Sequence, residues 1–167
     1  MTPTVRMFSR GAAVASIVVL STALAGCSLL NGFIGTDVQG EGESTDIFSI
    51  VVGDCVNDGV AEGTISSVPT VPCSEPHDSE VYAAVYLEDQ DFPGDDAILN
   101  EADTLCLAEF AGFMGVEYEA SIADIQYYFP TELTWASGDR EVLCLVYETD
   151  GAGNSIQTVG SLEGTGR

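Results

Sequence analysis

The sequence has no lysine and only four arginines among its 167 residues, whereas aspartate and glutamate together number 27. All of the acidic residues lie after position 27 and two of the arginines lie before it, so the later part carries two cations, 27 acids and a net charge of −25. Such a chain cannot release counterions from phosphates, and anionic lipid head groups repel it. This balance argues against nucleic-acid binding. It favours a solvated acidic surface, with calcium binding or a basic partner as alternatives.

Histidine is scarce as well, because His77 is the only one, and no cysteine pair has the C-x-x-C spacing of many structural zinc sites. A site built from His77, Asp78 and Glu80 would lack the further nitrogen or sulfur ligands that zinc usually takes. The sequence therefore predicts neither a metal nor a cofactor.

The neighbours of His77 form no recognisable catalytic motif. Ser74 and Ser79 are close in sequence, but adjacent residues of a strand point to opposite faces, and neither serine lies in a Gly-x-Ser-x-Gly elbow. No pair of carboxylates stands out as a glycosidase pair. We therefore expect a protein that is not an enzyme. The alternative is an envelope hydrolase or metal-dependent enzyme centred on His77.

Residues 1–26 have the order of an export signal. Arg6 and Arg10 precede the apolar run GAAVASIVVLSTALAG, which ends in small residues. A positive segment, a short apolar segment and a small-residue exit are typical of a signal peptide, and the run is too short and weakly flanked for a permanent span. We expect these residues to direct export and then to be removed.

The exit of this segment, Leu-Ala-Gly-Cys at 24–27, resembles the lipobox of bacterial lipoproteins. In that motif the cysteine is lipidated, so Cys27 is predicted to be a membrane anchor; ordinary cleavage or an uncleaved anchor are the alternatives. One acyl chain binds a membrane only marginally, at about 0.8 kcal/mol per buried methylene, whereas a diacylglyceryl group supplies two chains. The predicted protein is exported and faces the cell wall from the membrane.

Residues 27–46 are rich in glycine, serine, threonine and acid, with few apolar residues after Ile34. This composition predicts a flexible acidic tether. The folded domain is expected over residues 47–163, and residues 164–167 are expected to be a tail.

Four cysteines remain after Cys27, and an even number in an exported chain predicts two disulfides. Four cysteines allow three pairings, among which the sequence does not choose, although nearness favours Cys55–Cys73 and Cys106–Cys144. These bridges would close loops of roughly 18 and 38 residues, and each would contribute roughly 3 to 4 kcal/mol through chain entropy.

Hydrophobic periodicity predicts one helix and several strands. From about 95 to 114 apolar residues recur every three or four positions, with Pro93 and Gly94 before them and Gly115 after them, which indicates an amphipathic helix with Cys106 on its buried stripe. Clean alternation predicts a strand over 79–87. Further extended segments are expected at 46–53, at 63–73 as a proline-interrupted edge, at 121–129, at 140–149 and, after a turn at 150–154, at 155–162.

These elements predict an α+β fold in which a small antiparallel sheet of about five strands packs one face against the amphipathic helix. The two disulfides would staple this fold. A bridge from Cys106 would tie the helix to the strand that carries its partner.

Several segments together resemble the septum-formation domain family of actinobacterial envelope proteins. They are VGDCV at 52–56, VPCSEPHDSEVYA at 71–83, the cysteine-bearing helix and FPTELTWASGDREVLC at 129–144, in this order. The resemblance implies a place in division-septum formation or cell-wall assembly, and it implies no particular reaction.

Four further residues are structural or binding candidates: His77, Glu80, Trp135 and Arg140. Pro76 has a fixed φ and disfavours helical geometry at the residue before it, so His77 is expected in a structural corner where its ring bonds backbone groups or an acid.

Arg140 and Arg167 are the only cations after position 27. Because arginine binds a carboxylate through two parallel hydrogen bonds, Arg140 is predicted to pair with an acid near the histidine corner, namely Glu80, Asp78 or Asp54.

Trp135 is expected to pack beneath a loop, with an exposed contact for a glycan or a protein as the alternative. If the strands that carry them were neighbours, four tyrosines would join it in an aromatic face: Tyr82, Tyr86, Tyr127 and Tyr128.

The function that these observations favour is that of a lipid-anchored binding or scaffold protein of the cell envelope. Its partner would be an envelope or division protein or a cell-wall component. An acidic lipoprotein that binds cations or solutes is a further alternative.

Overall fold

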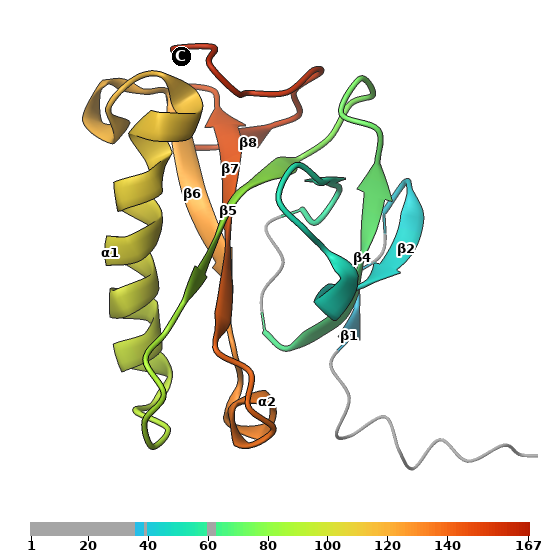
Figure 1. Cartoon of the computed structure of the whole chain (residues 1–167). Coiled ribbons are helices and arrows are strands. Elements are labelled where there is room, and N and C mark those ends of the chain that lie inside the picture. The colour runs from blue at the N-terminus through green and yellow to red at the C-terminus, as the bar shows by residue number, and fades with distance from the viewer. Residues whose placement is uncertain (1–35, 39, 60–62) are drawn as a thin grey trace, which may run out of the picture.

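The computed structural model of the chain describes residues 36–38, 40–59 and 63–167 (Figure 1). The predicted signal segment and Cys27 lie outside these residues, as do residues 28–35 and 39 of the predicted tether. In the part that is described, no helix is both long enough and apolar enough to cross a membrane.

The fold is α+β, with one long helix and a curled, mostly antiparallel sheet. The strands are β1 (Thr36–Asp37), β2 (Glu43–Asp46), β3 (Cys55–Val56), β4 (Ile65–Val71), β5 (Ser79–Tyr86), β6 (Ala123–Tyr128), β7 (Glu141–Thr149) and β8 (Ser155–Ile156). Their order is β1-β4-β3-β5-β7-β6, with β2 also paired to β4 and β8 to β7, and only the β1–β4 pair is parallel.

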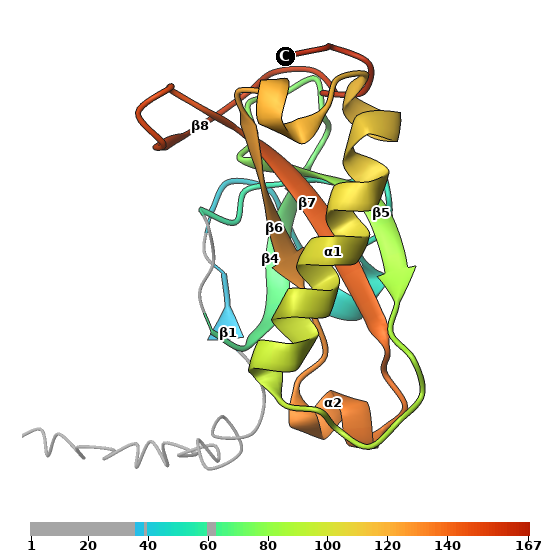
Figure 2. The ribbon, with the colours of Figure 1, turned by 90° about the vertical axis from the view of Figure 1, so that its left-hand side faces the viewer.

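The helix α1 (Asp95–Met114) covers one face of β5, β7 and β6 (Figure 2). Its residues at spacing four are fully buried: Ile98, Ala102, Cys106, Phe110 and Met114. The negative charges of Asp95 and Asp96 in the first turn stabilise the helix by interacting with the positive end of its dipole. Gly115 ends the helix in the left-handed conformation, with φ 78°. The helix predicted from the periodicity is therefore confirmed.

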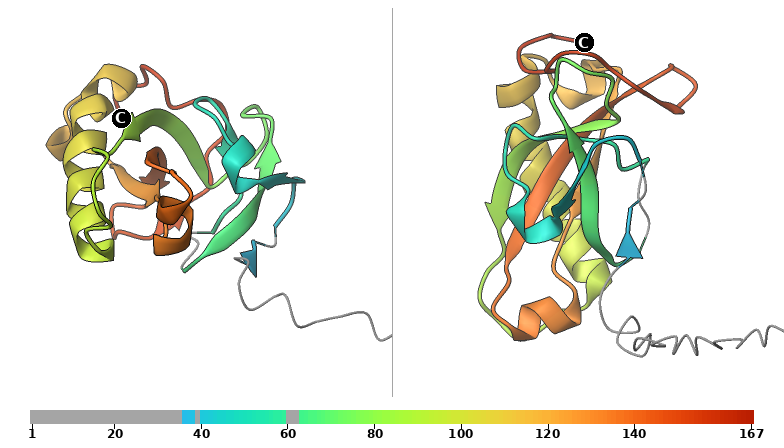
Figure 3. Two further views of the ribbon diagram at one scale, coloured as in Figure 1. Left: turned by 60° about the horizontal axis from the view of Figure 1, so that its bottom comes forward. Right: turned by 90° about the vertical axis from the view of Figure 1, so that its right-hand side faces the viewer.

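The sheet curls, so that β4, β2 and β1 lie on the side of β7 away from α1 (Figure 3). Strand β7 is consequently buried on both faces. Val142, Cys144 and Val146 belong to the core beneath α1, whereas Leu143 and Leu145 belong to a second core inside the curl. This two-sided burial explains why the segment is a continuous apolar run rather than an alternating one.

Both disulfides are formed, and they have the pairing that nearness favours. Cys106 of α1 is bonded to Cys144 of β7, and Cys55 of β3 to Cys73, which follows β4. The first bridge is buried beneath the helix and fastens it to the middle of the sheet.

The prediction of about five strands was too low, since the sheet has eight in the described residues. The additional strands, β1, β2 and β3, have only two to four residues each. Such short pieces are held by partners distant in sequence, so no local period marks them.

The segment 46–53 was wrongly predicted to be a strand. After β2 the chain forms the 3₁₀ helix η1 (Ile47–Ser49), and then turns before β3. Two aspartates determine this path: the Asp46 carboxylate accepts a hydrogen bond from the Phe48 amide, and that of Asp54 accepts one from the Val51 amide, both at 2.9 Å.

Strand β4 was wrongly predicted to be an edge. It lies between β3 and the pair β1 and β2, although it contains Pro69. The Pro69 carbonyl accepts the Asn57 amide at 2.9 Å just beyond the end of β3. This bond uses the proline carbonyl, so the missing proline amide does not remove it.

The boundaries of the predicted tether and tail also need correction. Residues 43–46 form β2, whose Thr45 hydroxyl lies 2.7 Å from that of Thr70. At the other end, the amides of Gly164 and Gly166 donate to carbonyls of Phe113 and Met114, so the tail docks on the end of α1. Polar segments can join a fold in this way because backbone hydrogen bonds need no apolar side chains.

The last predicted strand, 155–162, is shorter than expected. Only β8 pairs with β7, and Thr158 then forms an isolated bridge with His77. Two short elements complete the described fold: the 3₁₀ helix η2 (Tyr118–Ala120) and the helix α2 (Glu132–Ala136).

Candidate functional site

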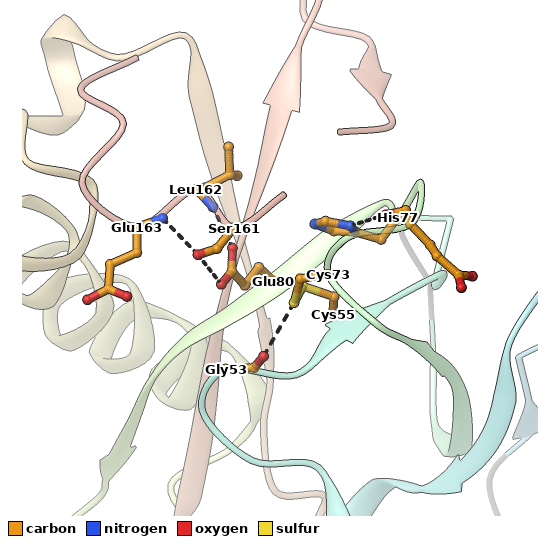
Figure 4. The surroundings of a disulfide bond; sticks show 9 residues. Gly53, Cys55, Cys73, His77, Glu80, Ser161, Leu162 and Glu163 are labelled. Carbon is orange, nitrogen blue, oxygen red and sulfur yellow. Dashed lines mark hydrogen bonds between the residues drawn. A yellow bond between two sulfur atoms is a disulfide. The ribbon is translucent and has the colours of Figure 1, made fainter. Parts of the chain in front are cut away.

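His77 lies in a closed corner just before β5 (Figure 4). Its side chain is 0 % exposed, and its backbone exchanges two hydrogen bonds of 3.0 Å with Thr158. The ring nitrogen Nδ1 lies 2.9 Å from the Glu75 carbonyl oxygen, whereas Nε2 is buried without a hydrogen-bond partner. Because a carbonyl only accepts, Nδ1 carries a proton, and in this tautomer the lone pair of the ring is at Nε2.

Glu80 is buried next to this corner without a cation. Its two carboxylate oxygens accept hydrogen bonds of 2.7 Å from the Ser161 hydroxyl and the Leu162 amide. The ion pairs among the described residues are instead Arg140–Asp89 and Arg167–Glu148. The chain after β8 thus covers the corner and stabilises the buried carboxylate through hydrogen bonds.

The Cys55–Cys73 disulfide lies beside His77 and Glu80. Cys55 is buried and pairs directly with Glu80 across β3 and β5, whereas Cys73 is half-buried. Cys55, His77 and Glu80 each offer one ligand atom, and these atoms lie within 4.8 Å of one another. Asp78 points elsewhere, since its carboxylate accepts from the Gly59 amide and the Gln157 side chain.

A second buried polar cluster lies inside the curl of the sheet. The Asp58 carboxylate accepts hydrogen bonds from Ser79 at 3.0 Å, Gln126 at 2.6 Å and Tyr128 at 2.5 Å. Burial, which disfavours the charged form, raises the pKa of Asp58 above 3.8. The Ser79 hydroxyl is therefore directed at Asp58 and not at His77. Sequence reasoning missed this cluster, because the residues that bond Asp58 lie 21 to 70 positions after it in the sequence.

A surface groove of about 620 Å³ lies between η1, the start of β4, the end of β6 and α2. Its apolar lining includes Phe48 and Leu133, whose exposed fractions are 69 % and 61 %. Five acidic residues line it, and no arginine does: Asp46, Asp95, Glu132, Asp139 and Glu141. The groove therefore combines exposed apolar side chains with a purely acidic charge, a combination that no local motif indicated.

Trp135 lies in α2 and is buried. Its ring packs edge-on against Phe92 at 5.8 Å, and its Nε1 donates to the Gln90 carbonyl at 3.0 Å. The guanidinium carbon of Arg140 lies 3.8 Å from the centre of the Trp135 ring. The tryptophan thus packs beneath a loop and beneath a cation.

The predicted partners of Arg140 were wrong. Its guanidinium donates to the Trp135 and Asp139 carbonyls and to the Asp89 carboxylate, the last at 2.9 Å. Glu80 pairs with Val146 on β7, which places it six residues, or roughly 20 Å, along the strand from Arg140. The Asp89 side chain is 92 % exposed, so this ion pair contributes at most about 1 kcal/mol.

The four tyrosines do not form a common face with Trp135. Strand β7 lies between β5 and β6, which separates the tyrosines of these two strands. Tyr82 is buried and donates to the Cys106 carbonyl, whereas Tyr86 is exposed and donates to Glu141. Adjacent residues on β6 point to opposite faces, so Tyr127 bonds Asp103 of α1 and Tyr128 points into the curl.

Comparison with known proteins gives one match. A family model described as septum formation matches residues 52–166, which is more than half of the chain. No curated protein and no solved structure matches the chain.

Proposed function

The chain belongs to the septum-formation family, and from this membership we propose that it is a non-catalytic binding protein of the cell envelope, anchored in the membrane by a lipid on Cys27. The family membership gives it a role connected with cell division or the envelope. Two disulfides accord with an oxidising compartment outside the cytoplasm.

The groove is the observation that carries the binding role. Its exposed Phe48 and Leu133 offer an apolar contact, and the five carboxylates around them attract cations. We propose that its ligand is a basic segment of an envelope or division protein, with lysine or arginine beside an apolar residue. Complementary charge would guide such a segment into the groove, and the apolar contact would hold it there.

The surroundings of His77 support a binding role over a hydrolytic one. A nucleophilic mechanism needs a hydroxyl or thiol within hydrogen-bonding reach of its base. The Ser79 hydroxyl donates to Asp58, and the His77 ring is enclosed, with Nδ1 bonded to the Glu75 carbonyl.

Groove substitutions test the binding role. We expect Glu132→Gln combined with Leu133→Ala to weaken binding of an amphipathic lysine–leucine peptide roughly tenfold, the equivalent of about 1.4 kcal/mol, because it removes one charge and one apolar anchor. Affinities would be measured by fluorescence anisotropy of the labelled peptide at several salt concentrations.

A matched control separates the groove from general acidity. Glu109→Gln with Leu99→Ala makes the same chemical changes at two residues of α1 that do not line the groove, and should leave the affinity unchanged. Equal weakening in both double variants would show that the peptide responds only to net charge, and would remove the groove from the proposal.

The lipid anchor has a separate test. In an actinobacterial host, the intact mass of the wild-type protein should include a diacylglyceryl group. The Cys27→Ser variant should lack this added mass and should no longer be found in the membrane fraction, because it has no acyl chains to insert into the membrane. Four other thiols should become alkylatable only after reduction. An unlipidated wild-type mass would contradict the anchor and leave the groove experiment unaffected.

A further inference from the structure

We propose that the Cys55–Cys73 disulfide conceals a zinc site, which forms when the disulfide is reduced and whose ligands are Cys55, Cys73, His77 and Glu80. This inference concerns the corner before β5 and is independent of the groove. In the oxidised protein the two sulfurs are bonded to each other, so only a nitrogen and a carboxylate would be available.

The corner brings the ligand atoms together from distant parts of the chain. Cys55 lies in β3, directly opposite Glu80 of β5, and His77 lies three residues before Glu80. These three side chains are buried, and their ligand atoms lie within 4.8 Å of one another. The fourth ligand, Cys73, is already next to Cys55 through the disulfide.

The His77 ring is held in the tautomer that a metal requires. Its Nδ1–H is bonded to the Glu75 carbonyl, which leaves the Nε2 lone pair buried and without a partner. Ligating histidines are typically fixed in this manner, with the second ring nitrogen donating to a carbonyl or carboxylate. In Figure 4 the ring and the Glu80 side chain project into the same space beside the disulfide.

Glu80 is held in a comparable way. Ser161 and Leu162 each donate one hydrogen bond to its carboxylate, which orients it and leaves further lone pairs on both oxygens. Ordinary ion pairing does not account for this buried acid, because both arginines of the described residues pair with other carboxylates. Hydrogen bonds of this kind orient the carboxylate ligands of metal sites.

The chemistry needs a dithiol reductant. Its thiolate attacks the half-buried Cys73 sulfur and forms a mixed disulfide, while Cys55 leaves with the electron pair of the broken bond. The second donor sulfur then displaces Cys73, so the donor departs as a disulfide and the protein holds two thiols. Zinc binding displaces their two protons and gives a four-ligand set of two sulfurs, one nitrogen and one carboxylate oxygen.

Zinc titration of the full chain in both redox states tests the proposal. The probes are Zn²⁺, measured against a chromophoric chelator, and Co²⁺, whose thiolate charge-transfer bands report sulfur ligation. After mild reduction, alkylation mapping should find free thiols at Cys55 and Cys73, while the Cys106–Cys144 bridge remains shielded beneath α1. We expect one zinc ion per reduced chain and none per oxidised chain.

Two variants and a matched control identify the ligands. His77→Ala and Glu80→Gln should each weaken zinc binding by at least roughly tenfold. A loss of about tenfold is the smallest expected when a residue that hydrogen-bonds to a metal ligand is replaced, and a ligand itself should matter at least as much. Asp78→Asn, which alters the acid next to His77 that bonds Gly59 and Gln157, should bind zinc like the wild type.

Two results would overturn the proposal: a reduced wild-type chain that binds no more zinc than the oxidised chain, or full affinity in His77→Ala. If that variant does not fold, the Co²⁺ spectrum of the wild-type protein tests the site instead. Thiolate bands that persist after alkylation of Cys55 and Cys73 would show that other sulfurs bind the metal, and would refute the site. The groove variant Glu132→Gln with Leu133→Ala should retain zinc binding, which keeps the two proposals separable.

Discussion

Replacing Phe110 by alanine should lower the free energy of unfolding by roughly 3 to 5 kcal/mol. Phe110 is fully buried beneath α1, and its ring makes edge contacts with Tyr82 at 6.1 Å and Tyr118 at 5.3 Å. The substitution removes both contacts and leaves a cavity that cannot collapse readily, because Cys106, one turn earlier, is bonded to β7. Urea unfolding would measure the loss.

Leu99→Ala is the control for this substitution, because it shortens an apolar side chain on the solvent side of the same helix. Leu99 is 37 % exposed, so its loss should cost less than about 1 kcal/mol. Similar losses for the two variants would mean that the packing face of α1 has been wrongly identified.

Removing the Cys106–Cys144 bridge by a double substitution to alanine should cost about 4 kcal/mol, since this bridge closes a loop of 38 residues. For a chain of this size the melting temperature should fall by roughly 8 to 16 °C. Thermal unfolding followed by circular dichroism would measure the shift.

The other bridge provides a comparison, because Cys55–Cys73 closes only 18 residues and should contribute about 3 kcal/mol by the same chain-entropy argument. A melting temperature within about 2 °C of the wild type in the Cys106/Cys144 variant would correspond to less than about 1 kcal/mol, and would contradict the entropic contribution.

The long elements could be predicted because their signals are local. The helix at 95–114 combines a period near 3.6 with a glycine at each end. The strand over 79–86 was found from its alternation, although a bulge between Val81 and Ala83 interrupts that alternation in the structure. The short strands β1, β2 and β3 could not be predicted. The polar β2, for example, is a strand only because β4 supplies its hydrogen bonds.

The candidate sites, too, could be predicted only in part from the sequence. The sequence singled out His77 and Glu80, since a lone histidine next to a proline and a future disulfide is conspicuous. It did not reveal that Cys55 lies opposite Glu80, because that pairing depends on the register between β3 and β5. The groove was also unforeseen, since its lining residues come from segments that meet only when the sheet curls.

The sequence by itself determined the acidic charge, the helix, the long strands and the family resemblance, all of which depend on residue type and on spacing along the chain. Only the tertiary structure decided that Arg140 pairs with Asp89, that β7 separates the tyrosines, and that Cys55, His77 and Glu80 share one buried corner. The physical reason is that strand order, register and curl bring together residues far apart in sequence, and these depend on how the whole chain buries its apolar surface.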